Sequence, residues 1–86
     1  HKAKPEDLEV TFQYGLLCCQ IGLYEPADKL LGKVVGNGDN ADAEYNMGLL
    51  KLMKDDDREQ ALEHFHRAVD IQADHHLAHN AISKLK

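Results

Sequence analysis

The chain nearly repeats itself at a fixed spacing. Gly15 and Gly48 are 33 residues apart, and Ala27 and Ala61, which follow them, are 34 residues apart. A repeat of this length, with small residues at fixed positions, is typical of helical hairpins that bury their apolar faces against one another. The repeat therefore predicts an all-α stack of hairpins, which presents a surface to a partner and not a reaction centre.

Length and composition restrict the chain to one domain. Its 86 residues suffice for a single hydrophobic core. Hydrophobic residues make up 43% and charged residues 29%, which is too apolar for an intrinsically disordered chain. The formal net charge of -5 disfavours nucleic acid as a partner and argues against a helix-turn-helix nucleic-acid binder.

Three further features concern the membrane, the cellular compartment and the extent of the chain. No apolar run approaches the roughly 20 residues that a membrane-spanning helix needs, so we expect no membrane insertion. Cys18 and Cys19 are neighbours on a predicted helix, where their side chains diverge and cannot readily pair, and unpaired thiols favour the cytoplasm. Because the chain opens at His1 and not at a methionine, and stops at Lys86 within what would be a third repeat, we expect a segment of a longer protein.

Periodicity and capping residues predict five helices joined by short turns, which make neighbouring helices antiparallel. Pro5 suits the first turn of the first helix, and Gly22 ends it. Asp39 or Asn40 can cap the third helix. Asp57, with a glutamine three residues later, resembles a capping box, and Asp74 can cap the last helix. The expected helices cover about residues 5–21, 26–35, 40–54, 57–72 and 74–85.

The repeated motifs resemble those of the tetratricopeptide repeat (TPR) family, whose pattern is Trp-x2-Leu-Gly-x2-Tyr followed by Ala-x3-Phe. The first copy contains Tyr14-Gly15 and Ala27-x3-Leu31, and the second contains Met47-Gly48 and Ala61-x3-Phe65. The resemblance implies a right-handed stack of antiparallel helical hairpins, a TPR-like α-solenoid of about five helices. It places repeat one at about residues 8–40, repeat two at about 41–75 and a capping helix at about 76–86.

Several positions depart from the family pattern. The aromatic opening position holds Thr11 and Glu44, and the tyrosine position holds Cys18 and Lys51. The copies also differ by one residue in spacing, so the stacking angle is expected to differ from the usual one. Sel1-like repeats are the nearest alternative family, but their extra glycine-rich turns are not evident in this sequence.

In this family the first helix of each hairpin lines a concave groove, so the resemblance implies a partner-binding surface. An apolar groove of this kind suits a peptide or an amphipathic helix, which makes the chain a protein–protein interaction module. The alternative is a homo-oligomer or scaffold segment whose groove is covered by another copy or by flanking repeats. The expected groove residues are Phe12, Leu16, Cys19, Tyr45, Asn46, Leu49, Leu52, Met53, Leu77 and Asn80, and the same register adds Glu9, Gln20 and Asp42.

The opposite stripe of the first helix is also apolar. It contains Tyr14, Leu17, Cys18 and Ile21. Because a helix that is hydrophobic nearly all round is normally buried, we expect this helix to be covered on both sides.

Some TPR proteins clamp the terminal carboxylate of heat-shock chaperones with Lys, Asn and Arg in the groove. Among the groove positions that would carry these side chains, only Asn46 matches. The other clamp positions hold Phe12, Leu16, Leu77 and Ala81. A chaperone-tail clamp is therefore disfavoured. Bacterial secretion chaperones with apolar grooves are closer in surface character.

The remaining polar motifs indicate neither a metal nor an enzyme. His75 and His79 are four residues apart and could both face a metal ion, but the sequence offers no third metal ligand near them. We therefore expect both histidines to be solvated. The run Asp55-Asp56-Asp57 lacks the glycine and distal glutamate of a calcium loop, and is expected to form a polar turn. No nucleophile, base and orienting group converge in the sequence, so we expect no catalysis and no cofactor.

Overall fold

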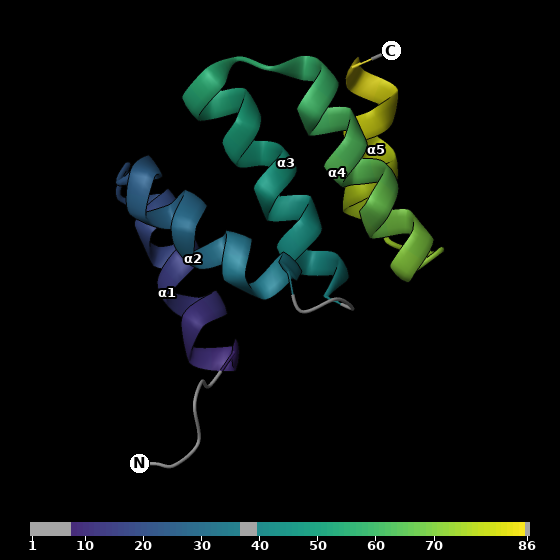
Figure 1. The fold of residues 1–86 in the computed structure, drawn as a ribbon. Coiled ribbons are helices and arrows are strands. Elements are labelled where there is room, and N and C mark those ends of the chain that lie inside the picture. Colours follow the sequence, from purple (N-terminus) through teal and green to yellow (C-terminus); the bar gives the residue numbers. More distant parts are fainter. Residues whose placement is uncertain (1–7, 37–39, 86) are drawn as a thin grey trace.

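The computed structural model describes residues 8–36 and 40–85, which form five α-helices and contain no strand (Figure 1). The predicted all-α class and the number of helices are confirmed, and the helix ends from Gln20 onward lie within two residues of the predicted ones. The predicted first turn at Pro5 and the alternative cap at Asp39 lie outside the described residues. The helices are α1 (Leu8–Gln20), α2 (Tyr24–Gly36), α3 (Ala41–Asp55), α4 (Arg58–Ile71) and α5 (His76–Leu85).

Each helix packs mainly against its neighbours in the chain. Helices α1 and α2 form one hairpin, and α3 and α4 form a second. The hairpins are joined where α2 packs on α3, and α5 packs on α4 at the end of the row (Figure 1). Helix α1 also contacts α3, so the first helices of the two hairpins lie beside each other.

Side-chain caps begin α3 and α4. The Asn40 side chain accepts a hydrogen bond from the amide of Ala43, and the Asp57 side chain accepts one from the amide of Gln60, both at 3.0 Å. These bonds satisfy amides that have no partner in a first helical turn. The amide of Asp57 itself donates to the Lys51 carbonyl, so only one half of the predicted capping box is present.

The two repeated glycines make equivalent contacts in the two hairpins. A Cβ atom added to Gly15 would lie 2.8 Å from Cδ2 of Leu31, and one added to Gly48 would lie 2.5 Å from Cε1 of Phe65. Neither distance leaves room for a methyl group, so in both hairpins the helices meet at a point that requires glycine. The residues that face the glycines are the fully buried Leu31 and Phe65.

The buried core runs along the stack in three clusters. Helix α1 supplies none of their fully packed members, since its one buried residue is Gly15. Its partly buried Phe12, Cys18 and Cys19 pack against the first cluster from outside. Helix α1 therefore contributes to the core only one buried glycine and partly buried side chains. The clusters are Ala27, Leu31, Met47 and Leu50; Ala41, Ala68 and Ala78; and Ala61, Phe65 and Ile82.

Two departures from the repeat pattern are explained by polar contacts between helices. Glu44, which is only 5% exposed, has Oε1 2.9 Å from Nδ1 of His64, and this contact links α3 to α4. Lys51 has Nζ 3.7 Å from Oδ2 of Asp28, which links α3 to α2. Both polar side chains on α3 therefore occupy interhelical positions where the contacting residue is also polar.

Candidate functional site

Two adjoining pockets open along α3. One of about 380 Å³ lies between α3 and α5, and one of about 270 Å³ lies between α1 and α3. Leu49 lines both, so the pockets share a wall, and we call them together the groove. The groove is lined by Leu16, Cys19 and Gln20 of α1; Tyr45, Asn46, Leu49, Leu52 and Met53 of α3; and Leu77, Asn80, Ala81, Lys84 and Leu85 of α5.

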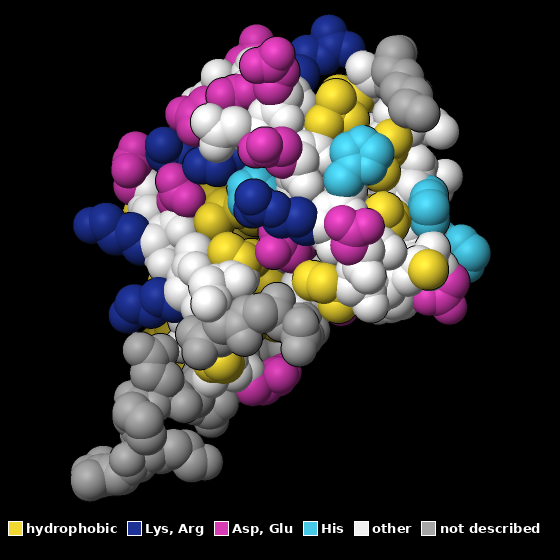
Figure 2. Space-filling model, turned by 45° about the vertical axis from the view of Figure 1, so that its right-hand side comes forward, with side chains coloured by type: hydrophobic (Ala, Val, Ile, Leu, Met, Phe, Trp, Pro, Cys, Tyr) yellow, Lys and Arg dark blue, Asp and Glu magenta, His cyan; other side chains and the backbone are white. Residues whose placement is uncertain are grey.

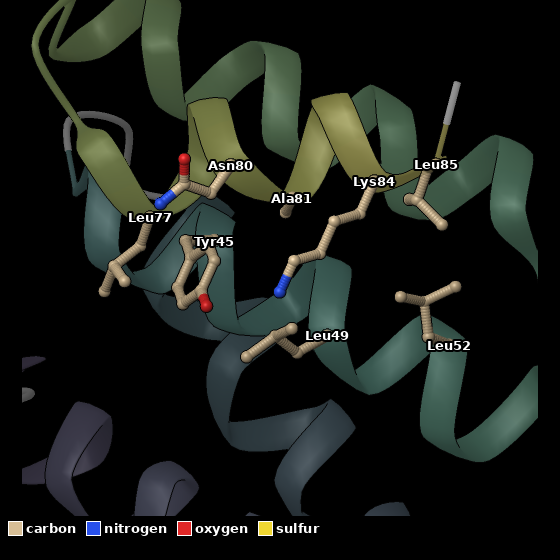
Figure 3. A pocket seen from close by; sticks show the side chains of 8 residues that line it. All are labelled: Tyr45, Leu49, Leu52, Leu77, Asn80, Ala81, Lys84 and Leu85. Atoms are coloured by element: carbon tan, nitrogen blue, oxygen red, sulfur yellow. The ribbon is translucent and has the colours of Figure 1, made fainter.

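Figure 3 shows the part of the groove between α3 and α5. Tyr45 and Leu49 project from α3, and the long side chain of Lys84 reaches from α5 toward both of them. Lys84 is the one charged side chain among the described residues that line the groove. The groove is therefore an apolar channel with a single cation, placed at its α5 side.

The structure brings together ten of the thirteen residues that the sequence analysis placed in the groove. The exceptions are Glu9, Asp42 and Phe12, and Phe12 packs instead against the core cluster of α2 and α3. Sequence reasoning missed Lys84 and Leu85, and it named Ala81 only as a position of the chaperone-tail clamp. The signal for Lys84 and Leu85 was available, because they follow Leu77 by seven and eight residues and so share its helical face.

The groove floor is attached to the core. The Tyr45 ring is close to two other rings, since its centroid lies 5.7 Å from that of Phe65 and 5.4 Å from that of His75. Leu49 packs against the cluster that contains Phe65. Leu77 and Met53, by contrast, are 57% and 49% exposed and form the rim. A preformed floor with exposed apolar rim residues is suited to binding, because little ordering is needed on contact.

Cys19 lies where the groove meets α1. Burial raises the pKa of its thiol, and the neighbouring Cys18 raises that pKa further. A raised pKa keeps the thiol protonated near neutral pH, so Cys19 acts as a small apolar side chain and not as a nucleophile. Both cysteines are free thiols, as the sequence predicted.

Two of the polar residues assigned to the groove face elsewhere. Asp42 is bonded to a histidine of the loop before α5, with Oδ1 2.8 Å from Nε2 of His75. Glu9 accepts a hydrogen bond from the Gln13 amide one turn further along α1, at 3.2 Å. Neither carboxylate lines the two pockets, so the groove has less negative charge than the sequence register implied.

His75 is buried, and its predicted solvation is wrong. Only 5% of it is exposed, and its Nδ1 accepts a hydrogen bond from the amide of Ala78 at 3.1 Å. His75 therefore caps α5 in place of the expected Asp74. Because Nδ1 accepts, the ring proton lies on Nε2, which donates to Asp42. The imidazole thus joins the starts of α5 and α3 as a structural group.

We expect His75→Ala to lower the free energy of unfolding by about 1–3 kcal/mol, because it removes a helix cap and leaves a buried space. Urea denaturation followed by circular dichroism measures the loss. His76→Ala is the matched control, since the next histidine is exposed and its loss should stay within about 0.5 kcal/mol. Equal effects of the two substitutions would contradict a structural role for His75.

The face shown in Figure 2 differs from the groove. Charged and histidine side chains cover much of it, and apolar side chains form only small patches between them. Acidic side chains gather at the top of this view, where the turn between α3 and α4 lies in Figure 1. Such a mixed polar surface is ordinary for a face exposed to water.

The described residues contain neither a metal-binding cluster nor a membrane-spanning helix. Within residues 8–36 and 40–85, no three or more His, Cys, Asp or Glu side chains are arranged to hold a metal ion. None of the helices formed by these residues combines the length and the apolar character that crossing a bilayer requires. Comparison with protein-family models finds no match to the chain, and comparison with curated proteins finds no relative. The case for function therefore depends on the groove.

Proposed function

We propose that the chain is a protein–protein interaction module whose groove binds an amphipathic helix or an apolar peptide segment of a partner. The observation that carries this proposal is the mainly apolar lining supplied by α1, α3 and α5. A partner helix would place side chains on one of its faces into the two pockets on either side of Leu49. Binding would draw its free energy mainly from the apolar area removed from water.

The architecture supports a TPR-like reading. The contact between Gly15 and Leu31 in the first hairpin recurs between Gly48 and Phe65 in the second. The first helix of each hairpin, together with α5, supplies the groove, which is the arrangement that the TPR resemblance implies. We therefore propose two degenerate TPR repeats with a capping helix, stacked as a right-handed solenoid.

The chemistry of the lining favours binding over catalysis. Its described polar groups are one cation, three side-chain amides, one phenol and one thiol whose pKa is raised. No acid–base pair is formed among them, whereas the apolar side chains are numerous and partly exposed. The free thiols further support a reducing compartment, which we propose is the cytoplasm.

We expect peptides selected from a displayed random library on this protein to bind Leu77→Asp and Met53→Asp at least about tenfold more weakly, which corresponds to about 1.4 kcal/mol. A carboxylate placed in an apolar contact is desolvated without a counter-charge. Because Leu77 and Met53 are each about half exposed, we expect both variants to remain folded. Circular dichroism checks their helical content. Fluorescence anisotropy of labelled peptides measures the affinities.

Leu17→Asp is the matched control for this experiment. Leu17 is 49% exposed, like the rim residues, but lies on the other face of α1 and lines neither groove pocket. Selected peptides should bind this variant as tightly as the parent. If all three variants bind equally well, the groove is not the binding surface.

The alternative occupant of the groove is a second copy of the chain or a flanking repeat. If a second copy occupies the groove, no peptide would be enriched from the library, and Leu77→Asp would abolish a self-association seen in the parent by analytical ultracentrifugation. The two outcomes separate a peptide-binding module from a homo-oligomer held by its groove.

A further inference from the structure

The outer face of α1 carries an exposed apolar stripe, although the sequence analysis expected this face to be buried. Val10, Tyr14 and Leu17 are 51%, 59% and 49% exposed, and Ile21 just beyond the helix is 62% exposed. The amide of Ile21 still donates to the Leu17 carbonyl at 3.1 Å, so it continues the same helical face. We call these four residues the outer stripe.

The outer stripe has the spacing of a helix-pairing seam. Its members are separated by four, three and four residues, the alternation that places side chains along one line in a two-helix coiled coil. Gly15 lies on the opposite side of α1, where it contacts α2. The stripe therefore faces away from the hairpin, and a shallow pocket lined by Val10, Tyr14, Leu17 and Gln13 opens on it.

Charge makes this face suited to a second copy of the same chain. The side chains that flank the middle of the stripe on α1 are uncharged, although the chain as a whole has a net charge of -5. When two copies of a face meet across a two-fold axis, charges near the axis approach their own equivalents, so an uncharged centre avoids like-charge repulsion. The uncharged flanking residues are Thr11, Gln13, Cys18 and Gln20, and the charged Glu9, which is bonded to Gln13, lies at one end of the stripe.

The other end of the stack does not match the stripe. Helix α5 exposes His76, His79 and Ser83, which are polar. Copies stacked head to tail would therefore press the apolar stripe against polar side chains and desolvate them. A symmetric contact of stripe with stripe places apolar surface against apolar surface.

We propose that the outer stripe is a self-association surface on which α1 of a second copy packs antiparallel, across a two-fold axis. The antiparallel arrangement sets opposite helix dipoles beside each other, and a two-fold contact closes at two copies. The axis passes between Tyr14 and Leu17. It places Tyr14 of each copy against Leu17 of the other, and Val10 against Ile21.

The size of the stripe predicts a weak dimer. Four half-exposed side chains present roughly 400 Å² of apolar surface, comparable to the largest patch on an ordinary monomer. Pairing would bury about twice that area, which is below the roughly 1,200 Å² of stable interfaces. We therefore expect a dimer that dissociates when the protein is diluted to micromolar concentration. Leu16 and Cys19 line the groove and are not stripe residues, so the groove stays open in this dimer.

Analytical ultracentrifugation of the whole chain, under reducing conditions from about 10 µM to 1 mM, tests the proposal. The parent should shift from monomer to dimer over this range. Leu17→Glu and Tyr14→Lys should each stay monomeric. An equimolar mixture of the two variants should dimerise again, because only the antiparallel pairing sets the new carboxylate opposite the new ammonium group.

Leu77→Glu is the matched control, because Leu77 is an equally exposed leucine on the groove rim. It should dimerise like the parent. Circular dichroism verifies that every variant is helical. A parent that stays monomeric to about 1 mM, a dimer that survives Leu17→Glu but not Leu77→Glu, or a mixture that fails to restore the dimer would overturn the proposal.

Discussion

Replacing Phe65 with alanine is expected to lower the free energy of unfolding by about 3–5 kcal/mol. Phe65 is fully buried, and it joins three helices: it contacts Gly48 on α3 and shares a core cluster with Ile82 on α5. Its ring also lies 5.7 Å, between centroids, from that of Tyr45. Removing the ring leaves a cavity that close-packed neighbours cannot fill. Urea denaturation followed by circular dichroism gives the free energy.

Tyr14→Ala is the matched control, because Tyr14 is an aromatic residue that is 59% exposed. At micromolar concentration, where the proposed dimer is dissociated, its effect should stay within about 0.5 kcal/mol. Comparable losses from the two substitutions would mean that Phe65 is not the centre of the second hairpin.

Replacing Gly48 with leucine is expected to cost about 3 kcal/mol or more, the upper end of the range for overpacked cores. Even a Cβ atom at this position would lie 2.5 Å from Cε1, 2.7 Å from Cδ1 and 2.9 Å from Cζ of Phe65. Because the ring is fully buried, it cannot move aside without displacing α3 from α4. Thermal and urea denaturation both measure the loss.

Gly36→Leu is the control for this substitution. Gly36 is exposed at the end of α2, and a Cβ atom there would meet nothing within 4 Å. The same change of residue should therefore alter stability by no more than about 0.5 kcal/mol. A Gly48→Leu variant as stable as the Gly36→Leu variant would remove the close-packing account of the repeated glycines.

Local signals in the sequence predicted the helices well. A cap such as Asn40 or Asp57 acts on amides three residues away, and Gly22 ends a helix by adopting a φ of +85°, so both are visible in a short window. The groove was predicted for a related reason. Once the helices and their register are known, residues that share a face, such as Leu77 and Asn80, follow from the helical period.

What the sequence did not show depends on distant parts of the chain. In the sequence His75 cannot be distinguished from the surface histidines near it. Its contact with Asp42, which lies 33 residues earlier, forms only when the chain folds. Similarly, an apolar stripe around Leu17 indicates burial, but whether a helix covers it depends on how many helices surround α1. Phe12 lies at the boundary between groove and core, where a small rotation of the helix decides its neighbours.

Leu49 combines both roles and is therefore a poor single test of function. It lines both pockets of the groove, yet it also packs against the cluster that contains Phe65. Leu49→Asp is expected to weaken binding and folding together. The exposed Leu77 and Met53 separate the two effects, because they line the groove without being buried in the core.

The most direct test of the groove is to map a selected peptide onto the protein by nuclear magnetic resonance. Peptide is titrated into labelled protein, and methyl and amide chemical shifts are followed. Our account predicts that the largest shifts fall on the methyl groups of Leu16, Leu49 and Leu77, which line the groove on three different helices. Largest shifts at Leu17 on the outer stripe, or at the exposed Ile71 of α4, would contradict it.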